Sequence, residues 1–241
     1  MATETTHTFC RICEAGCGLT VTTDGDRVIR IDPDKDHVGS QGDACVKGTR
    51  FGELHHSPDR LDHPMKRFGD EWTEISWDQA LEEIAAKVND IRARHGDDAV
   101  AGYLGNPAAF GALHPTAFHA FMLGLGTTNV FSSASQDLTN KYLVAQRMYG
   151  VPLLQPIPDL DRTEFAMLIG TNPQISQMSV VQAPKPTQRL KAIVDRGGRV
   201  VHVNPRRTET ARAVGEQVFV RPGTDVFLLA AFLHELLAGD H

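Results

Sequence analysis

The hydrophobic pattern near the start of the chain is an alternation of apolar and polar residues. It covers residues 19–22 and 27–31, with Asp24 and Gly25 between the two runs. A period of two is typical of half-buried strands, and Asp-Gly is a common hairpin turn. The pattern therefore predicts a small β-rich module, which we place at residues 1–62.

A helical period replaces this alternation further along. Apolar residues recur at intervals of three and four from Leu81 to Ile91. Ser76 and Gln79 precede them with the spacing of a capping box, and Gly96 follows as a stop signal. The pattern predicts one long amphipathic helix between Ser76 and Gly96.

Predicted strands and helices then alternate to the end of the chain. The expected strands are 99–104, 129–132, 165–170, 199–203 and 218–220. The expected helices are 115–124, 139–149, 187–196 and one that opens at Thr224 and Asp225. Continuous apolar runs such as 165–170 are typical of strands buried on both faces. This order predicts an α/β fold, with a mostly parallel, helix-flanked sheet over residues 63–241.

Composition narrows the function classes. The 241 residues are 41% hydrophobic and 22% charged, as in ordinary globular proteins, with a net charge of −6. Nucleic-acid binding needs a basic surface, so the negative charge argues against it. No apolar run is long enough to span a bilayer, and we see no targeting segment before the first cysteine. We therefore expect no membrane segment and a cytoplasmic location.

All four cysteines of the chain follow one spacing, Cys10-x2-Cys13-x3-Cys17-x27-Cys45. Packing cysteines would be scattered, so the pattern favours thiolate metal ligands. Four thiolates satisfy a [4Fe–4S] cluster, and they also satisfy a tetrahedral zinc ion. The three-residue gap departs from the two-residue spacing usual at zinc, which favours the cluster. Two disulfides are disfavoured, because nothing indicates secretion.

Three polar loops follow the last predicted strands. Ligands of open α/β sheets bind beyond the carboxyl ends of the strands, and these loops offer donors suited to phosphate. The sequence contains neither a Gly-x-Gly-x-x-Gly fingerprint nor a Walker lysine loop. Each loop taken singly also fits an ordinary solvated turn. The loops are Gly170-Thr171-Asn172-Pro173, Asn204-Pro205-Arg206-Arg207-Thr208-Glu209-Thr210 and Arg221-Pro222-Gly223-Thr224-Asp225.

The cysteine spacing, followed by Val46-Lys47-Gly48, resembles the amino-terminal domain of the molybdopterin oxidoreductases. This family includes formate dehydrogenases and nitrate reductases. The three polar loops resemble the family's nucleotide-binding loops and occur in the same order. The resemblance covers essentially the whole chain.

The resemblance implies two cofactors. One is a [4Fe–4S] cluster bound by the four cysteines, and the other is a molybdenum or tungsten bis(molybdopterin guanine dinucleotide). Lys47 is implied to lie between them as an electron relay, although a solvated surface lysine is the alternative. The residues implied to bind the dinucleotide are Gly170, Asn172, Pro173, Asn204, Arg206, Thr208, Thr210, Gly223 and Asp225.

The protein ligand to the molybdenum or tungsten is a point of departure from the family. Members with a cysteine or selenocysteine ligand place it in the segment that matches 131–138, where this chain has no cysteine. Asp137 is the first candidate, Ser135 the second, and a centre without a protein ligand the third. Asp137 also fits an N-cap of the helix predicted from Thr139. Leu138 stands where formate dehydrogenases have a histidine, which argues against formate.

The chain is also several times shorter than family members, which complete the pterin site with a carboxyl-terminal domain. We therefore expect the N-terminal portion of an oxidoreductase, inactive alone, that serves a small-molecule substrate and an electron-transfer partner. Two rival functions remain open. One is a cluster-binding electron-transfer or accessory subunit without catalysis, and the other is a zinc-stabilised structural module. His114 and His119 are interpreted as surface or packing residues.

Overall fold

The computed structural model describes residues 2–179 and 181–239. The chain forms two compact units, and their boundaries do not follow the order of the sequence. The first unit contains the residues up to Pro33 together with Val46–Gln155. The second contains Asp34–Cys45 and the residues from Pro156 onward. The twelve-residue stretch from Asp34 to Cys45 therefore packs with residues that come far later in the chain.

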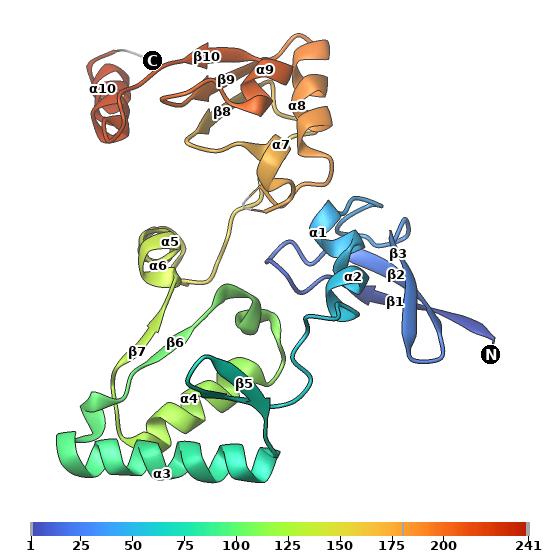
Figure 1. Ribbon diagram of the computed structural model, residues 1–241. Helices are drawn as coiled ribbons and strands as arrows, with labels where there is room; N and C mark the ends of the chain where they lie inside the picture. The colour runs from blue at the N-terminus through green and yellow to red at the C-terminus, as the bar shows by residue number, and fades with distance from the viewer. Residues whose placement is uncertain (1, 180, 240–241) are drawn as a thin grey trace. The chain divides into compact units, whose positions relative to one another are not determined.

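A three-stranded antiparallel sheet opens the first unit (Figure 1). Its strands, in spatial order, are β1 (Thr3–Phe9), β2 (Gly18–Asp24) and β3 (Arg27–Pro33). The predicted hairpin is confirmed, and Gly25 takes the positive φ of 57° that its turn requires. β1 was not predicted, because all seven of its residues are exposed and its sequence lacks an apolar face.

Two short helices follow and pack on β3. They are α1 (Val46–Thr49) and α2 (Phe51–His55). Gly52 of α2 lies against Val28 and Ile31, where an added Cβ would be 3.2 Å from the nearest carbon. These helices carry the residues after Cys45 across the antiparallel sheet.

The long helix α3 (Trp77–His95) comes after a small hairpin of β4 (Met65–Phe68) and β5 (Glu71–Glu74). Its predicted N-cap is confirmed, because the Ser76 hydroxyl accepts a hydrogen bond from the Gln79 N–H at 3.1 Å. The Gln79 side chain donates instead to Glu83, so the second half of the capping box is absent. Gly96 ends the helix at a φ of 84°.

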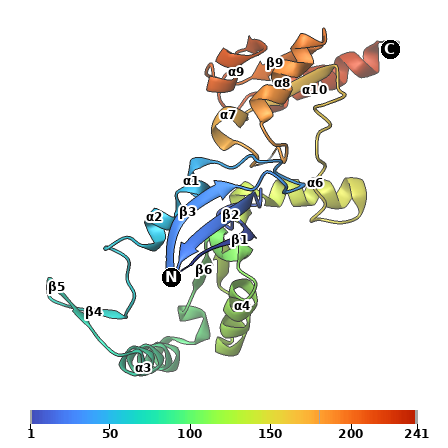
Figure 2. The same cartoon turned by 90° about the vertical axis from the view of Figure 1, so that its right-hand side faces the viewer.

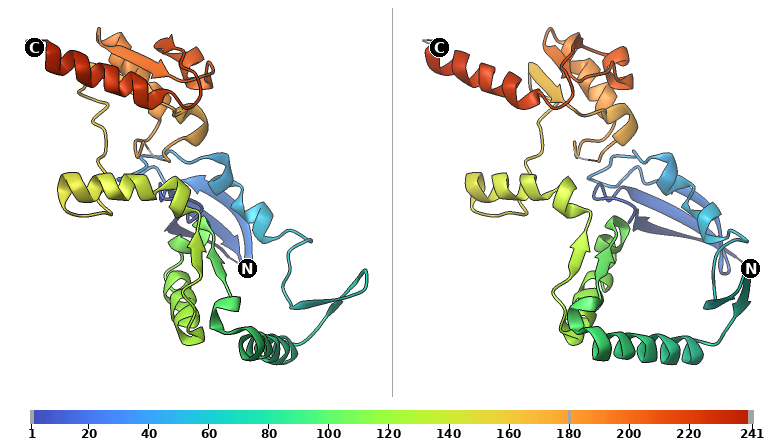
Figure 3. Two further views of the ribbon diagram at one scale, coloured as in Figure 1. Left: turned by 90° about the vertical axis from the view of Figure 1, so that its left-hand side faces the viewer. Right: turned by 60° about the vertical axis from the view of Figure 1, so that its left-hand side comes forward.

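A parallel pair of strands, β6 (Gly102–Leu104) and β7 (Val130–Ser132), forms the other sheet of this unit. Figure 3 shows α4 (His114–Leu125) running alongside the pair. The contact is close, since a Cβ on Gly102 would lie 2.7 Å from the Phe118 ring. The remaining helices are η1 (Asp97–Ala99), η2 (Asn106–Phe110), α5 (Ala134–Asp137) and α6 (Thr139–Tyr149).

The second unit is built on a parallel sheet whose strand order is β10-β9-β8. The strands are β8 (Phe165–Ile169), β9 (Arg199–Val203) and β10 (Glu216–Val218), and α8 (Pro186–Asp195) packs on β9 (Figure 2). The core side chains are Leu160, Leu168, Ala183, Leu190, Ile193 and Val200. The other helices are α7 (Pro173–Ser176), α9 (Glu209–Ala213) and α10 (Asp225–Ala238).

The α/β class with a small β-rich module is confirmed, with three corrections. The parallel strands form two separate small sheets in place of one. β10 begins two residues earlier than expected, at Glu216, because pairing with β9 fixes its register. β8 is not buried on both faces, since Phe165 is 49% exposed. No helix in the described part of the chain has the length and apolar character needed to cross a bilayer.

Candidate cofactor site

Three of the four cysteines lie in the connection between β1 and β2. The Cys10 N–H donates to the Cys17 carbonyl at 2.8 Å, which closes this loop at its base. The Gly16 N–H donates to the Cys13 carbonyl at 3.4 Å, and Gly16 has a φ of 53°. Cys17 is buried, whereas Cys10 and Cys13 are half-buried. The turn between Cys13 and Cys17 thus depends on a residue with positive φ.

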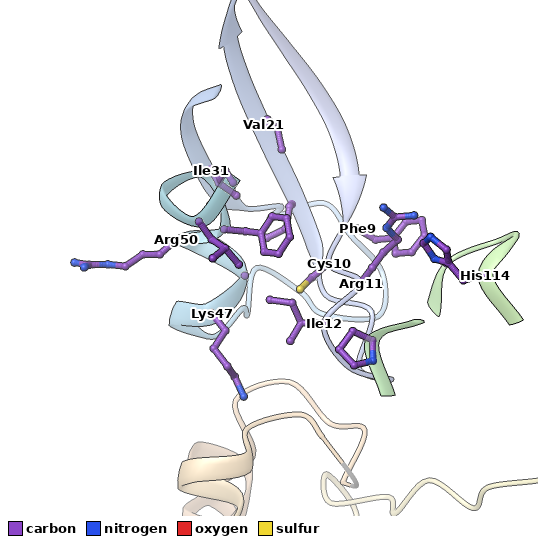
Figure 4. Close-up of a pocket in the computed structure, with 15 residues that line it drawn as sticks. Phe9, Cys10, Arg11, Ile12, Val21, Ile31, Lys47, Arg50 and His114 are labelled. Carbon is purple, nitrogen blue, oxygen red and sulfur yellow. The ribbon is translucent and has the colours of Figure 1, made fainter. Parts of the chain in front are cut away.

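A cavity of about 700 Å³ opens beside Cys10 (Figure 4). Apolar side chains from all three strands of the antiparallel sheet form much of its wall, and α1 contributes Lys47 and Gly48. In Figure 4 the Cys10 sulfur lies between Ile12 and α1, and the Lys47 side chain extends from the same helix. Cys10, which the cysteine spacing singled out, and Lys47, which the family resemblance implied, therefore line one cavity.

Gly48 makes the contact between α1 and the cysteine loop. It is buried, and an added Cβ would lie 3.3 Å from Cys10 Sγ and 3.7 Å from Cys10 Cβ. Few real Cβ contacts are that close, so a larger residue here would push against the sulfur. The space that Gly48 leaves is what lets this helix approach the Cys10 sulfur.

Arg11 and His114 line the same cavity and were not predicted to do so. His114 begins α4, which is distant in sequence from the cysteine loop. No local pattern marks either residue, because only the packing of the η2–α4 connection brings His114 to the cavity. His114 is an exposed residue, as interpreted from the sequence, and it also lines this cavity.

Cys45 ends the Asp34–Cys45 segment of the second unit, and it is half-buried. Among the described residues, no disulfide involves any of the four cysteines. In the same part of the chain, no three His, Cys, Asp or Glu side chains form a group that could hold a metal ion. The donor set nevertheless suits an iron–sulfur cluster, because it supplies four thiols and a glycine cradle beside Cys10.

A second cavity, of about 590 Å³, lies at the carboxyl ends of β6 and β7. The Asp137 N–H donates to the Ser133 carbonyl at 3.1 Å, and the Ser135 hydroxyl donates to the Ser132 carbonyl at 3.2 Å. The N-cap of α6 is Leu138, without a side-chain bond, so the alternative of Asp137 as an N-cap is wrong. The lining residues are Tyr103, Ser132, Ser133, Ser135, Gln136 and Asp137.

The three polar loops follow three adjacent parallel strands, so they share the carboxyl edge of one sheet. Asn172 links two of them. Its amide donates to Glu209 at 2.7 Å, and its Oδ1 accepts from the Thr210 hydroxyl at 2.8 Å and from the Thr210 N–H at 3.2 Å. The Thr210 hydroxyl also accepts from the Gln174 N–H at 2.9 Å. The loops after β8 and β9 are thus held together before any ligand binds.

Thr208 has a structural task as well. Its hydroxyl accepts from the Ala211 N–H at 3.1 Å and caps α9. Thr208 and Thr210 are 1% and 0% exposed, so their hydroxyls serve the protein interior. Both residues shape the loop, and the groups that this loop presents outward are the backbone and the arginines.

Arg206 is paired with Glu209, at 3.1 Å between Nη2 and Oε2. This hydrogen-bonded guanidinium, followed by a backbone hydrogen bond and the Asn172 amide, lowers the pKa of Glu209 to about 2. The Arg206 N–H donates to Asn204 Oδ1 at 3.2 Å. In the other loops, Gly170 and Gly223 have positive φ and open space where a Cβ would be. A phosphate-bearing ligand can approach the backbone at both glycines.

Comparison with known proteins bears on the whole chain. The family model for molybdopterin oxidoreductase matches residues 60–239, and the model for the molybdopterin oxidoreductase Fe4S4 domain matches residues 3–57. Together the two models indicate a [4Fe–4S] cluster and a molybdenum or tungsten molybdopterin cofactor. The four thiols suit the cluster, and the loops with open backbone at Gly170 and Gly223 suit the phosphates of the pterin cofactor.

Several curated proteins are similar to the chain. The molybdopterin-containing subunit PhsA of thiosulfate reductase from Salmonella typhimurium is 29% identical over 98% of this chain and 30% of its own length. A nitrate reductase from Symbiobacterium thermophilum is 28% identical over 95% of this chain and 30% of its own. The alpha subunit of F420-dependent formate dehydrogenase 1 from Methanococcus maripaludis is 25% identical over 96% of this chain and 33% of its own length.

A solved structure supports the fold. Acetylene hydratase from Pelobacter acetylenicus superimposes with a TM-score of 0.73 at 23% identity, over 96% of this chain and 32% of its own. The chain spans about a third of the length of the curated relatives it matches. With both family models matched in order along one chain, the protein belongs to the molybdopterin oxidoreductase family and contains its Fe4S4 domain.

Proposed function

We propose that this chain is the part of a molybdopterin-dependent oxidoreductase in which a [4Fe–4S] cluster relays electrons to or from the molybdenum or tungsten centre. The observation that carries the proposal is the cavity shared by Cys10 and Lys47, with Gly48 against the Cys10 sulfur. When bound, the pterin-held metal supplies two-electron chemistry, and the cluster passes electrons singly.

The four cysteines act as cluster ligands in this proposal, and Lys47 stands beside the cluster. A nearby ammonium favours the more reduced state of a cluster, so Lys47 raises its reduction potential. Its position on α1, one residue before Gly48, supports this role. We keep the division into a cluster domain at 1–62 and a dinucleotide-binding domain at 63–241.

The dinucleotide would be held at the carboxyl edge of the β10-β9-β8 sheet. Gly170 and Gly223 are exposed there, and the half-buried Asp225 begins α10 at the same edge. Asn204 and Arg206 present polar groups from the central loop. The remaining proposed residues act mainly by fixing loop shape, and they are Asn172, Pro173, Thr208 and Thr210.

Asp137 is proposed as the protein ligand to the molybdenum or tungsten, with Ser135 as the second choice. Both residues line the cavity at the carboxyl ends of β6 and β7. The Asp137 carboxylate does not cap α6, and oxygen ligands suit a hard, high-valent metal.

The full chain, purified and reconstituted without oxygen, tests the cluster. We expect the broad thiolate-to-iron absorbance and close to four irons for each chain, one for each thiolate. Zinc in place of iron would support the structural rival. A pterin released from the holoprotein would exclude an accessory subunit that carries only a cluster, and its absence would favour that subunit.

Lys47 has its own test. Replacing Lys47 with Met should leave the iron content unchanged and lower the cluster potential by about 59 mV, a tenfold change in a one-electron equilibrium. Lys47→Arg should restore most of the potential, because it keeps the charge. Lys87→Met, on the exposed face of α3, is the matched control. An unchanged potential in Lys47→Met would assign Lys47 to the solvated surface.

The partners follow from the same proposal. The substrate is a small molecule, the electron acceptor is a protein or domain, and the charge of −6 disfavours nucleic acid. We propose a cytoplasmic setting, because a reducing compartment suits thiolate metal ligands.

A further inference from the structure

The segment Asp34–Cys45 connects β3 to α1, yet it packs in the second unit. It is a compact loop with its own hydrogen bonds. The Gly42 N–H donates to the Asp34 carbonyl at 3.1 Å, and the Ser40 N–H donates to His37 Nδ1 at 3.1 Å. Asp34 and Ser40 are buried, at 7% and 0% exposure. These bonds hold the segment together, and Cys45 is its last residue.

Two contacts anchor this piece to α8. Asp43 Oδ2 accepts a hydrogen bond from the Lys185 N–H at 2.6 Å. Lys185 is the N-cap residue of α8 and has a positive φ of 51°. Gln41 Oε1 accepts from Arg189 Nη2 at 2.9 Å. The partners are 142 and 148 residues apart in sequence, so the anchors belong to the tertiary fold.

Arg189 is the hub of the anchor. Its Nε donates to the Pro184 carbonyl at 2.8 Å, and its guanidinium also pairs with Asp161. The side chain is only 22% exposed, so it is held on several sides. The planar guanidinium of Arg189 thus binds to the Asp34–Cys45 segment, to the start of α8 and to the loop before β8.

We propose that Asp43 and Arg189 are positioning residues for Cys45, the fourth cluster ligand; this rests on the proposed function. Asp43 is two residues from Cys45, so a displacement of its anchor is passed on to the Cys45 sulfur. A metal ligand must be held to within about 0.5 Å, and the groups that hold it matter nearly as much as the ligand. The position of Cys45 therefore depends on its anchor to α8.

Oxidative iron loss tests this directly in the reconstituted full chain. Ferricyanide removes one electron from the [4Fe–4S] cluster, one Fe²⁺ leaves, and a [3Fe–4S] cluster with a distinct EPR signal remains. We expect Asp43→Ala, which removes the acceptor for the Lys185 N–H, and Arg189→Gln to lose that iron about tenfold faster than the parent chain. Gln41→Ala, which spares the other bonds of Arg189, should show a smaller increase. Arg199→Gln breaks a pair with Glu216 in the same unit and is the control.

The outcomes separate the two proposals. A parent chain that takes up no cluster would overturn the proposed function. A parent chain with a full cluster, and variants that lose iron at the Arg199→Gln rate, would overturn the positioning role alone. Thermal unfolding of each variant identifies any that fail to fold. If Arg189→Gln fails to fold, the iron-loss rates of Asp43→Ala and Gln41→Ala decide the question.

Discussion

At the scale of single residues, Gly48 matters because it has no side chain, which leaves room for the Cys10 sulfur against α1. Replacing Gly48 with Ala places a methyl group 3.3 Å from Cys10 Sγ, so either α1 or the sulfur must shift. We expect the iron and acid-labile sulfide content after reconstitution to fall by about tenfold at limiting iron. Chemical analysis of the desalted protein gives the measurement.

The chain offers a matched control for this substitution. Gly52 lies in the next helix, α2, away from any cysteine. A Cβ added there would lie 3.2 Å from Val28, so the crowding is similar to that at Gly48. Gly52→Ala should keep its cluster. Equal loss in both variants would mean that helix packing, and not the thiolate contact, limits assembly.

His202 gives a prediction about pH. It lies in β9 at 1% exposure and donates from Nε2 to the Val214 carbonyl at 2.9 Å. Burial lowers the pKa of His202 below its ordinary value of 6.5, against a smaller opposing effect of the Val214 hydrogen bond. The unfolded chain therefore binds the proton more readily. Stability should fall below pH 6.5, by at most about 1.4 kcal/mol for each pH unit.

Urea unfolding between about pH 7.5 and about pH 5.5 measures this effect. His202→Gln keeps an amide donor near Nε2 and cannot titrate, so its stability should vary less over that range. His95→Gln, at an exposed position, should behave as the parent does. The prediction fails if the parent and His202→Gln show the same pH dependence.

Spacing along the chain singles out the four cysteines as predicted thiolate ligands, and the family resemblance adds Lys47 as a predicted relay. The structure places Cys10 and Lys47 at one cavity, and their roles stay predictions. Sequence alone could not identify His114 at the cavity, nor the internal tasks of Thr208 and Thr210. A threonine in the 204–210 loop could bind phosphate or fix the loop, and the sequence looks the same in both cases. Only burial separates the two uses.

At the scale of elements, the link between the loops after β8 and β9 decides the shape of the carboxyl edge of the β10-β9-β8 sheet. Thr210→Val removes the hydroxyl that donates to Asn172 and accepts from Gln174. We expect a loss of about 1–3 kcal/mol in the free energy of unfolding, because the Gln174 N–H loses its acceptor and Asn172 Oδ1 keeps only the Thr210 N–H. Urea unfolding at neutral pH provides the value.

Thr210→Ser should restore most of that stability, since it keeps the hydroxyl. Thr5→Val removes an exposed hydroxyl pair with Thr22 and should change stability by less than about 0.5 kcal/mol. If Thr210→Val is as mild as Thr5→Val, the buried link contributes little and the loops are held by other contacts.

Helices with caps were the most predictable elements. α3 begins after Ser76 as expected, and α6 ends at Gly150 with a left-handed C-cap. β1 could not be predicted, since it is defined by pairing with β2 and not by an apolar face. The start of β10 is likewise set by its register with β9.

At the scale of the whole molecule, the chain enters the second unit at Asp34, leaves it after Cys45 and enters again at Pro156. Proteolysis in the exposed loop around Leu153 and Ile157 tests this path. The two fragments should elute together in native buffer and separate in denaturant, because Asp34–Cys45 of one fragment packs with the other. Gln41→Ala combined with Asp43→Ala should weaken their association; separation of the parent fragments in native buffer would contradict this path.

This threading also sets an order of events during synthesis. The partners of Gln41 and Asp43 are made 148 and 142 residues later. At about 5–20 residues per second, the ribosome needs many seconds to supply them. The antiparallel sheet and its three cysteines can form in that interval, but Cys45 has no fixed place until α8 has emerged. Insertion of a complete cluster is therefore a late step in the maturation of this protein.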